Sequence, residues 1–320
     1  MGLGEFDIIR KYFAPASERS DVLLGIGDDA AVLEVGAERK LVVAMDTIVE
    51  GVHFPVGTDA ADVGYRALAV NLSDLAAMGA VPSWMTLSLA MPRADLGWLD
   101  GFAGGLLQLA HAHAVALVGG DTVQGPLAVT IQIAGWVEAD GWLRRSGARA
   151  GDILFVSGTP GDAAAGLALI QRAAAGDAAG AEHLIERFLR PEPRVQLGRA
   201  LRTVASAAID ISDGLLTDLD KLCAASGCGA QLDVDALPLS SALRAVFDAD
   251  ACVHYALAGG DDYEMIFSIP PTRIAQVAAL NNGNPALCTR IGEITGTRTV
   301  ECRRAGRAFA VERRGYEHFS

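Results

Sequence analysis

Short apolar runs alternate with longer Ala- and Leu-rich stretches along the chain of 320 residues. Runs such as KLVVAMD (40–46), SWMTLSLAM (83–91) and LAVTIQIAGWV (127–137) have the length and composition of β-strands. The Ala- and Leu-rich stretches between the first runs, 62–80 and 95–114, are predicted to be helices. This alternation predicts an α/β or α+β fold and argues against a helical repeat.

The polar, Gly-rich segment EADGWLRRSGARAG (138–151) interrupts this pattern. A new strand-like run, DILFVSG (152–158), follows it and leads through a turn into a helix predicted for 162–175. The second half then repeats the mixture of strands and helices. We therefore expect two domains, 1–138 and 139–320.

Composition narrows the class of protein. The chain is 51% hydrophobic and 20% charged, which is typical of a globular protein. It has no apolar run of the roughly 18 residues that span a membrane and no signal-peptide pattern, so we expect a cytoplasmic protein without a membrane partner. The five cysteines form no CxxC pair, which favours reduced, buried thiols. A net charge of −13 argues against nucleic acid as a partner.

Aspartates recur at the ends of the apolar runs. A single such aspartate is ordinarily a helix cap or a turn residue, and Asp74 and Asp162 each fit that explanation. The repetition favours a ligand site, because carboxylates without accompanying histidine or thiolate are typical Mg²⁺ ligands. The residues concerned are Asp28, Asp29, Asp46, Asp74, Asp121, Asp210, Asp213, Asp261 and Asp262.

A phosphate ligand would therefore depend on metal ions. The chain contains only three lysines and neither a Walker P-loop nor the protein-kinase motifs. The segment SGTPGDAAAG (157–166) is either an anion nest or a plain tight turn before a helix. VGGDT (118–122) is the better phosphate candidate, because its paired glycines allow close backbone approach while Asp121 holds a bridging metal.

Several longer motifs, in order, resemble the thiamine-monophosphate kinase family. Its superfamily includes aminoimidazole ribonucleotide synthetase, selenophosphate synthetase and a hydrogenase-maturation protein. The motifs run nearly end to end: GEFDII (4–9), GIGDDAAV (25–32), MDTIVEGVHF (45–54), RALAVNLSDLAAMGA (66–80), GGDT (119–122), RSGARAGD (145–152), SGTPGDAAAGL (157–167), RPEPR (190–194), AIDISDGL (208–215), GGDDYE (259–264) and GYEHF (315–319).

The resemblance implies ATP-dependent phosphorylation of thiamine monophosphate to thiamine diphosphate, with several Mg²⁺ ions and ATP as co-substrate. It implies that ATP contacts Gly120, Asp121, Arg145 and Ser212, and that His53, Asp261 and Tyr316 line the thiamine-phosphate pocket. The implied metal ligands are Asp28, Asp29, Met45 through its backbone, Asp46, Asp74, Asp121, Asp210, Ser212 and Asp213.

Three of these roles have plainer alternatives. His53 is equally well explained as a histidine satisfied at a strand end, Tyr316 as part of a frayed tail, and Arg145 as a solvated linker residue. Arg144 is an alternative to Arg145 for the phosphate contact. The family often carries glutamate where this chain has Asp261, so the shorter side chain has less reach.

The resemblance also implies an architecture. The N-terminal α/β domain is expected to pair its strands across a homodimer into a barrel-like core, with a C-terminal α/β domain covering it. Composition alone does not predict this arrangement.

No general base is expected, because the attacking phosphate oxygen is already ionised at neutral pH. The chemistry then requires metal-assisted, in-line transfer between two polyanions. One alternative is another ATP-dependent enzyme of the superfamily, such as aminoimidazole ribonucleotide synthetase. Selenophosphate synthesis is disfavoured because no cysteine precedes Cys223. The other alternative is a non-catalytic sensor of Mg²⁺ and nucleotide.

Overall fold

A computed structural model describes residues 8–13, 19–24, 26, 31–139, 141–172, 179–281, 287–311 and 315–316. The chain divides into two compact units. The N-terminal unit comprises 1–75 and 80–140, and the C-terminal unit comprises 76–79 and 141–320. In the described residues no helix is long and apolar enough to cross a membrane.

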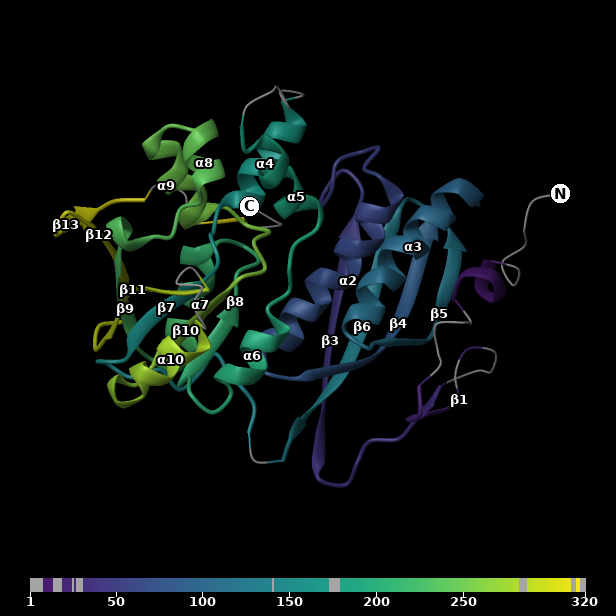
Figure 1. Ribbon diagram of the computed structural model, residues 1–320, viewed down its shortest axis with the longest axis horizontal. Coiled ribbons are helices and arrows are strands. Elements are labelled where there is room, and N and C mark those ends of the chain that lie inside the picture. Colours follow the sequence, from purple (N-terminus) through teal and green to yellow (C-terminus); the bar gives the residue numbers. More distant parts are fainter. Residues whose placement is uncertain are drawn as a thin grey trace. The chain divides into compact units, whose positions relative to one another are not determined.

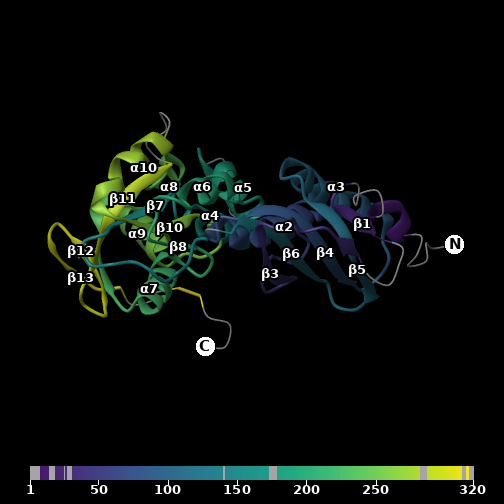
Figure 2. The ribbon, with the colours of Figure 1, turned by 90° about the horizontal axis from the view of Figure 1, so that it is seen from below.

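A mixed sheet with two helices on one face forms the N-terminal unit (Figures 1 and 2). The described strands of this sheet run in the order β3-β6-β4-β5, so β3 and β5 are its two edges. β6 pairs antiparallel with both β3 and β4, whereas β4 and β5 are parallel. The elements are η1 (Ile9–Phe13), β1 (Val22–Leu24), β2 (Val32–Leu33), β3 (Arg39–Val49), α2 (Ala60–Ala77), β4 (Val81–Met91), α3 (Leu96–Ala112), β5 (Ala116–Gln124) and β6 (Ala128–Glu138).

The two faces of this sheet differ sharply. Leu87, Leu89 and Ile131 alternate inward and are almost fully buried. α2 and α3 pack closely on one another, since a Cβ on Gly105 would lie 1.9 Å from the Ala61 carbonyl oxygen. On the other face the short β1–β2 pair packs over Trp84, and no other described element of this unit covers that face.

The C-terminal unit is built on a larger, mainly antiparallel sheet. Among the described residues its strands run in the order β13-β12-β9-β11-β7-β10-β8. The strands are β7 (Ile153–Ser157), β8 (Ala207–Asp210), β9 (Gly229–Asp233), β10 (Met265–Ile269), β11 (Cys288–Thr295), β12 (Val300–Arg304) and β13 (Arg307–Phe309). The helices are α4 (Asp162–Gln171), α5 (Ala181–Leu189), α6 (Val195–Leu201), α7 (Leu215–Ser226), η3 (Val234–Ala236), α8 (Ser241–Val246), α9 (Ala249–Ala258), η4 (Pro271–Arg273) and α10 (Ile274–Leu280).

Helix α7 packs against the sheet and contributes to the main hydrophobic core of this unit. Leu215, Leu219 and Leu222 are fully buried and pack with Leu154 and Ile209 of the sheet. β10 runs antiparallel to both β7 and β8. The strand ends at which β7 and β8 finish and β10 begins therefore lie side by side. This brings together the loops 158–161, 211–214 and 259–264.

The expected elements are present with shifted ends. The helix predicted for 162–175 is α4, and it ends at Gln171; residues 173–178 lie outside the described part of the chain. The five cysteines are all buried and free of disulfides, which confirms that interpretation.

Candidate active site

Asp46 and Asp121 lie on opposite edges of the N-terminal sheet. Asp46 of β3 is in register with Ile131 of β6, and Ile131 with Leu87 of β4 and then Gly120 of β5. Asp121 is one position further along β5, beside Ser88. Three strand spacings of about 4.8 Å separate the edges, so the two aspartates are about 14 Å apart within one chain.

The two aspartates also face opposite sides of the sheet. Residues paired across strands point to one face, and Asp46 shares the face of the buried Ile131 and Leu87. Asp121 is in register with Ser88 and Thr130, on the open face. One Mg²⁺, bound about 2.1 Å from each oxygen, cannot join side chains so placed in a single chain.

Asp46 lies close to helix α2. Its backbone N–H donates to the Oδ1 of the buried Asn71, 3.0 Å away, and the Asn71 amide donates to the Ala67 carbonyl at 2.9 Å. Asp74 follows Asn71 by three residues and therefore lies on the same side of α2. Asp74 sits in the interior of the helix, so its explanation as a helix cap is wrong. Asp46 and Asp74 are therefore both placed near Asn71, and their role as ligands of one ion stays a prediction.

Gly120 is explained by packing as well as by ligand binding. A Cβ at this position would lie 1.9 Å from the Leu87 carbonyl oxygen of the adjacent strand, and its φ is 151°. The close approach of β4 and β5 therefore requires glycine there with or without a phosphate. The predicted ATP contact at Gly120 stays a prediction.

His53 lies in the turn after β3. Its Nδ1 accepts a hydrogen bond from the Val49 backbone N–H at 3.0 Å, and the His53 backbone N–H donates to the Val49 carbonyl. With Nδ1 an acceptor, the proton of the neutral ring is on Nε2. The side chain is half-buried, as expected for a histidine satisfied at a strand end, and its substrate role remains a prediction.

The remaining predicted ligands of this unit add little geometry. Met45 is 64% exposed on the open face of β3. Asp28 and Asp29 lie outside the described residues.

In the C-terminal unit, the loop after β8 is organised by a carboxylate that sequence reasoning missed. Asp218, in the first turns of α7, is 1% exposed. Its Oδ2 accepts the backbone N–H groups of Ser212, Asp213 and Gly214 at 2.9, 3.0 and 3.3 Å. The loop that carries Ser212 and Asp213 is thereby held in one conformation. Its backbone donors are turned inward to Asp218.

Lys221 bridges the side chains of Asp213 and Asp218. Its Nζ lies 2.5 Å from Asp213 Oδ2 and 2.7 Å from Asp218 Oδ1. Burial raises the pKa of Asp218 to about 6 against the lowering effect of Lys221, and the neighbouring Asp210 and Asp213 raise it further. Asp210 is itself buried at the end of β8. The Asp210–Asp213 segment is therefore rich in negative charge, and the Lys221 ammonium group lies next to it.

Asp261 and Tyr316 come to this same loop from distant parts of the sequence. The Asp261 N–H donates to the Ser212 carbonyl at 2.8 Å, and the Tyr316 N–H donates to the Asp213 carbonyl at 2.9 Å. Asp261 has a left-handed backbone with φ 70°, and its Oδ1 accepts from the Tyr263 hydroxyl at 3.2 Å. Tyr316 is 42% exposed. The structure thus gathers the predicted substrate residues of this unit beside Ser212 and Asp213.

Backbone N–H groups at the loop before α4 donate to a side chain of the protein itself. The carboxylate of Asp262 accepts the Gly161 N–H at 2.8 Å and the Ala163 N–H at 3.4 Å, at the start of α4. Asp262 is fully buried, and burial raises its pKa well above the ordinary value. The backbone N–H groups of Gly161 and Ala163 in SGTPGDAAAG are thus occupied by Asp262, and phosphate binding by this segment stays a prediction. Asp162 is likewise structural, accepting from the Thr159 and Ser240 hydroxyls at 2.6 Å each.

Glu264 connects three of the sequence motifs. Its buried carboxylate accepts from Ser157 Oγ at 2.6 Å, from Arg187 at 2.7 Å and from two nitrogens of Arg194 at 2.6 Å each. Ser157 opens the 157–167 motif, Arg194 closes RPEPR, and Glu264 closes GGDDYE. Gly158 completes the fit, since a Cβ there would lie 2.0 Å from Glu264 Oε1. The hydrogen bonds to Glu264 thus fix the end of the 259–264 loop, which carries Asp261.

Arg145 lies away from this loop cluster. Its carbonyl accepts from the Ser226 hydroxyl at 2.9 Å, at the C-terminal end of α7. Ser212 precedes the N-terminal end of the same helix, which spans about 18 Å at 1.5 Å per residue. Within the C-terminal unit the two residues cannot hold the same phosphate group. The ATP role of Arg145 stays a prediction.

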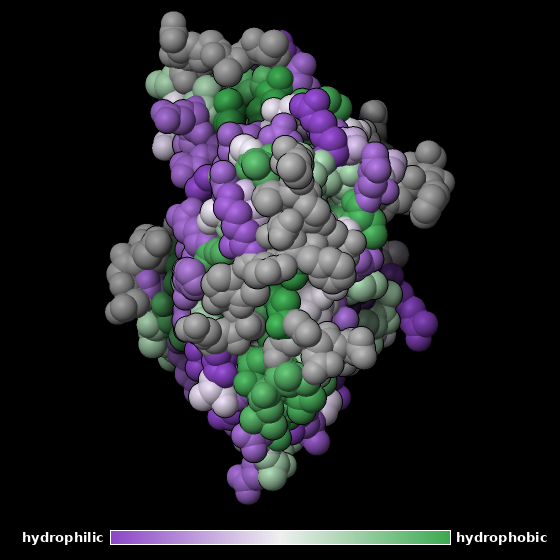
Figure 3. All heavy atoms as spheres, turned by 90° about the vertical axis from the view of Figure 1, so that its right-hand side faces the viewer, coloured by the Kyte–Doolittle hydropathy of each residue, from purple (hydrophilic) through white to green (hydrophobic). Residues whose placement is uncertain are grey.

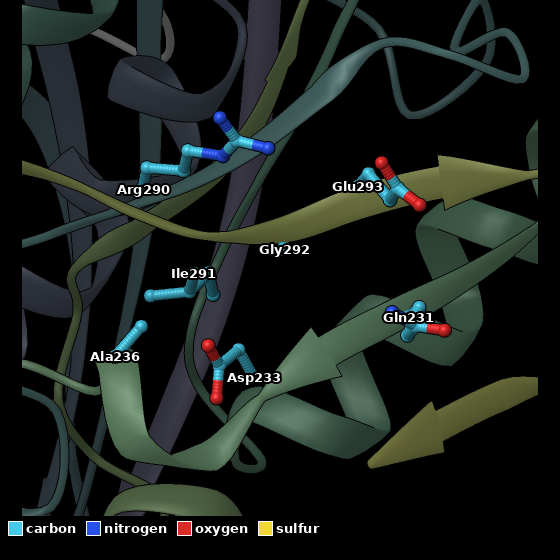
Figure 4. A pocket seen from close by; sticks show the side chains of 7 residues that line it. All are labelled: Gln231, Asp233, Ala236, Arg290, Ile291, Gly292 and Glu293. Carbon is cyan, nitrogen blue, oxygen red and sulfur yellow. The ribbon is translucent and has the colours of Figure 1, made fainter. Parts of the chain in front are cut away.

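A small cavity of about 310 Å³ beside β9 and β11 is a weaker candidate. Figure 4 shows the side chains of Arg290, Asp233 and Glu293 pointing in different directions from their strands. They do not converge on one ligand. Nor do three His, Cys, Asp or Glu side chains come together as a metal-binding group anywhere in the described ranges.

Asp218, Lys221 and Glu264 are the residues that sequence reasoning missed, whereas Asp262 was expected among the ligand aspartates and instead accepts backbone N–H groups at the start of α4. One signal was available for α7: Asp218 and Lys221 are three residues apart on a predicted helix directly after DISDG, a spacing that brings side chains together. Nothing in the sequence alone indicated that Asp262 and Glu264 point into the protein while Asp261 does not.

Comparisons with known proteins show the family. The family models for AIR synthase related protein match residues 27–137 with their N-terminal domain and residues 149–304 with their C-terminal domain. The chain is 46% identical over 326 residues to the thiamine-monophosphate kinase of Salmonella typhimurium, covering 100% of this chain and 99% of that protein.

Two solved structures are similar over nearly the whole chain. The thiamine-monophosphate kinase from Stenotrophomonas maltophilia K279a has a TM-score of 0.88 at 46% identity, covering 97% of this chain and 99% of that one. AaThiL complexed with AMPPCP and TMP has a TM-score of 0.78 at 32% identity, covering 99% of this chain and 97% of that one.

Proposed function

The chain belongs to the AIR synthase related protein family and, within it, to the thiamine-monophosphate kinases, and from that premise we propose how its residues carry out the reaction. The enzyme transfers a phosphoryl group from ATP to thiamine monophosphate and forms thiamine diphosphate. The observation that carries this function is 46% identity over the full length of a kinase relative. The similar structure with AMPPCP and TMP supports the same pair of substrates.

The donor set fits magnesium. The predicted ligands are carboxylates with an added hydroxyl and backbone oxygen, which are the hard ligands that Mg²⁺ prefers. Asp46 donates its backbone N–H to Asn71 of α2, the helix that carries Asp74, and Asp210 ends β8 three residues before Asp213. When bound, the ions would neutralise the charges on ATP and on the acceptor phosphate.

The protein's own residues then bind and orient the substrates. The acceptor phosphate is already ionised, so no side chain needs to remove a proton. Asp218 holds the Ser212–Gly214 loop, and Asp261 and Tyr316 lie beside that loop where the thiamine phosphate is proposed to bind. The exposed ring of Tyr316 is suited to stacking on the cationic thiazolium.

The separation of Asp46 from Asp121 supports a homodimer whose active sites are shared. If both aspartates serve one metal centre, the β3 edge of one copy must lie beside the β5 edge of the other. Asp46 and Asp121 of the partner subunit would then lie on adjacent strands, with their side chains on opposite faces of the closed sheet. Pairing at both edges closes two four-stranded sheets into an eight-stranded barrel, whose interior is just wide enough to be filled by side chains.

The open face has the composition of such an interior. Leu41, Val43 and Met45 of β3 are 52%, 50% and 64% exposed, and Val123 of β5 is 45% exposed. Figure 3, which views the molecule from the side of the N-terminal unit, shows hydrophobic side chains at the surface. A row of exposed apolar residues on a sheet is a mark of an interface.

Mixing two inactive variants tests the shared site. Asp46→Asn and Asp121→Asn are each expected to lose activity alone. If subunits exchange freely, half the dimers are mixed and each mixed dimer has one intact site, so activity returns to about one quarter of wild type. Asp100→Asn, an exposed residue of α3, is the control and should keep full activity. No recovery in dimers shown to have exchanged would refute the shared site.

The function itself is tested by forming thiamine diphosphate from thiamine monophosphate and ATP, with and without Mg²⁺. We expect metal-dependent product that is lost in Asp121→Asn and retained in Asp100→Asn. Folded, ATP-binding protein that yields no product would refute the kinase function. The cytoplasmic location is part of this proposal, supported by five free, buried cysteines, and cell fractionation tests it.

A further inference from the structure

A second cavity, of about 660 Å³, lies in the C-terminal unit. It is at the strand ends opposite those that carry the loop cluster, which consists of the loops 158–161, 211–214 and 259–264. Its lining includes Asp152 just before β7, Ser206 just before β8 and Pro270 just after β10. The loops of the candidate active site follow β7 and β8. Strands of four and five residues separate the two places by about 13–17 Å.

Four arginines line this cavity: Arg144, Arg149, Arg202 and Arg273. Asp152 is the carboxylate among the lining residues, and its Oδ2 is occupied by the Arg149 backbone N–H at 3.0 Å and the Ser206 hydroxyl at 2.6 Å. Within the part of the chain that the structure describes, none of the four guanidinium groups forms an ion pair with Asp or Glu. Such a positive cluster is unexpected in a chain of net charge −13.

The lining also offers an aromatic surface. Trp142 is 37% exposed, and the Arg144 guanidinium carbon lies 5.4 Å from its ring centre. Arginines recognise phosphate through paired hydrogen bonds, and an exposed indole stacks on flat rings. The volume falls within the roughly 300–1,000 Å³ of small-molecule sites.

We propose that this cavity binds a phosphate-bearing small molecule with a flat ring, separately from the phosphoryl-transfer site. Adenine nucleotides and thiamine phosphates share that chemistry. The guanidinium groups are permanently charged, so this binding requires no metal. The acidic loop cluster has the opposite requirement, since it repels phosphates unless metal ions are bound.

Metal-free titration calorimetry separates the two sites. ADP, thiamine diphosphate and inorganic pyrophosphate are each titrated into the full-length enzyme in EDTA. The test variant is Arg149→Ala/Arg202→Ala. The matched control is Arg172→Ala/Arg199→Ala, which removes two exposed arginines outside the cavity lining. Circular dichroism checks that both variants are folded.

We expect ADP or thiamine diphosphate to bind without metal to the wild type and the control, and at least tenfold more weakly to the test variant. The tighter of the two ligands identifies the source, and pyrophosphate should bind more weakly than either. With Mg²⁺ and saturating substrates, the test variant should keep the wild-type kcat. The proposal fails if the wild type binds nothing in EDTA, or if the test variant binds like the control. Pyrophosphate binding as tightly as the ring-bearing ligands would refute the contact with Trp142. Equal loss of ADP binding and kcat would show that the cavity belongs to the kinase site.

Discussion

Replacing Glu264 by glutamine should destabilise the protein strongly. The carboxylate is 0% exposed and receives hydrogen bonds from Ser157, Arg187 and Arg194. The side chains of Arg187 and Arg194 are themselves only 12% and 15% exposed. Glutamine keeps the shape but leaves two largely buried positive charges without their counter-charge. Breaking a buried ion pair by removing one partner costs about 3–5 kcal/mol in the free energy of unfolding.

The chain provides a matched control on the same arginine. Glu192 lies 2.9 Å from Arg194 Nη1, and its side chain is 68% exposed. Because an exposed ion pair contributes about 0–1 kcal/mol, Glu192→Gln should change stability little. Each variant removes one carboxylate charge that pairs with the Arg194 guanidinium. The two carboxylates differ mainly in how deeply they are buried.

Urea unfolding measures the difference. At an m-value of about 2.5 kcal/mol/M, the loss in Glu264→Gln lowers the midpoint by about 1–2 M. Burial by itself would raise the pKa of Glu264, but the charges and hydrogen bonds of Arg194 and Arg187 outweigh it and lower the pKa below the ordinary 4.5. The stabilisation is therefore complete above about pH 4.5 and is lost as pH falls through the lower pKa of the folded state.

The gap between wild type and Glu264→Gln should accordingly be constant near neutral pH and shrink in acid. A midpoint for Glu264→Gln no lower than that of Glu192→Gln would refute this reasoning. So would a gap that widens below pH 4.5.

Three further predictions follow from particular contacts. Asp218→Ala leaves three backbone N–H groups of the Ser212–Gly214 loop without their acceptor, so the Mg²⁺ concentration for half-maximal activity should rise at least several-fold while the fold persists; an unchanged Mg²⁺ dependence in assays would contradict the role given to Asp218. Gly198→Ala places a Cβ 2.0 Å from the Ala76 carbonyl oxygen and should lower thermal stability, whereas Gly104→Ala in α3, with nothing within 4 Å, should raise stability by up to about 1 kcal/mol; equal melting temperatures would count against it. All five cysteines are buried, and burial raises the pKa of Cys223 and Cys288 to about 12, so a thiol reagent should label the native protein slowly and all five positions rapidly in denaturant; rapid labelling of native protein would show that one is accessible.

The sequence by itself determined the alternation of strands and helices, because hydrophobic periodicity is a local property of the chain. The runs at 40–46, 83–91 and 127–137 became β3, β4 and β6. The motif resemblance also identified the family correctly, since ordered motifs along the whole chain are specific. The expected placement of aspartates at strand ends is confirmed for Asp210, the last residue of β8, but Asp46 and Asp121 lie within β3 and β5, and Asp74 lies within α2.

Only the tertiary structure decided what each acidic residue faces. Asp261, Asp262 and Glu264 are close neighbours in one motif, yet Asp262 caps α4, Glu264 pairs with two arginines, and Asp261 lies beside Ser212. Those partners come from residues 157–162, 187–194 and 211–213, so no local pattern could assign them. The strand order likewise put Asp46 and Asp121 on opposite edges of one sheet, because pairing between distant segments, unlike periodicity, depends on the whole fold.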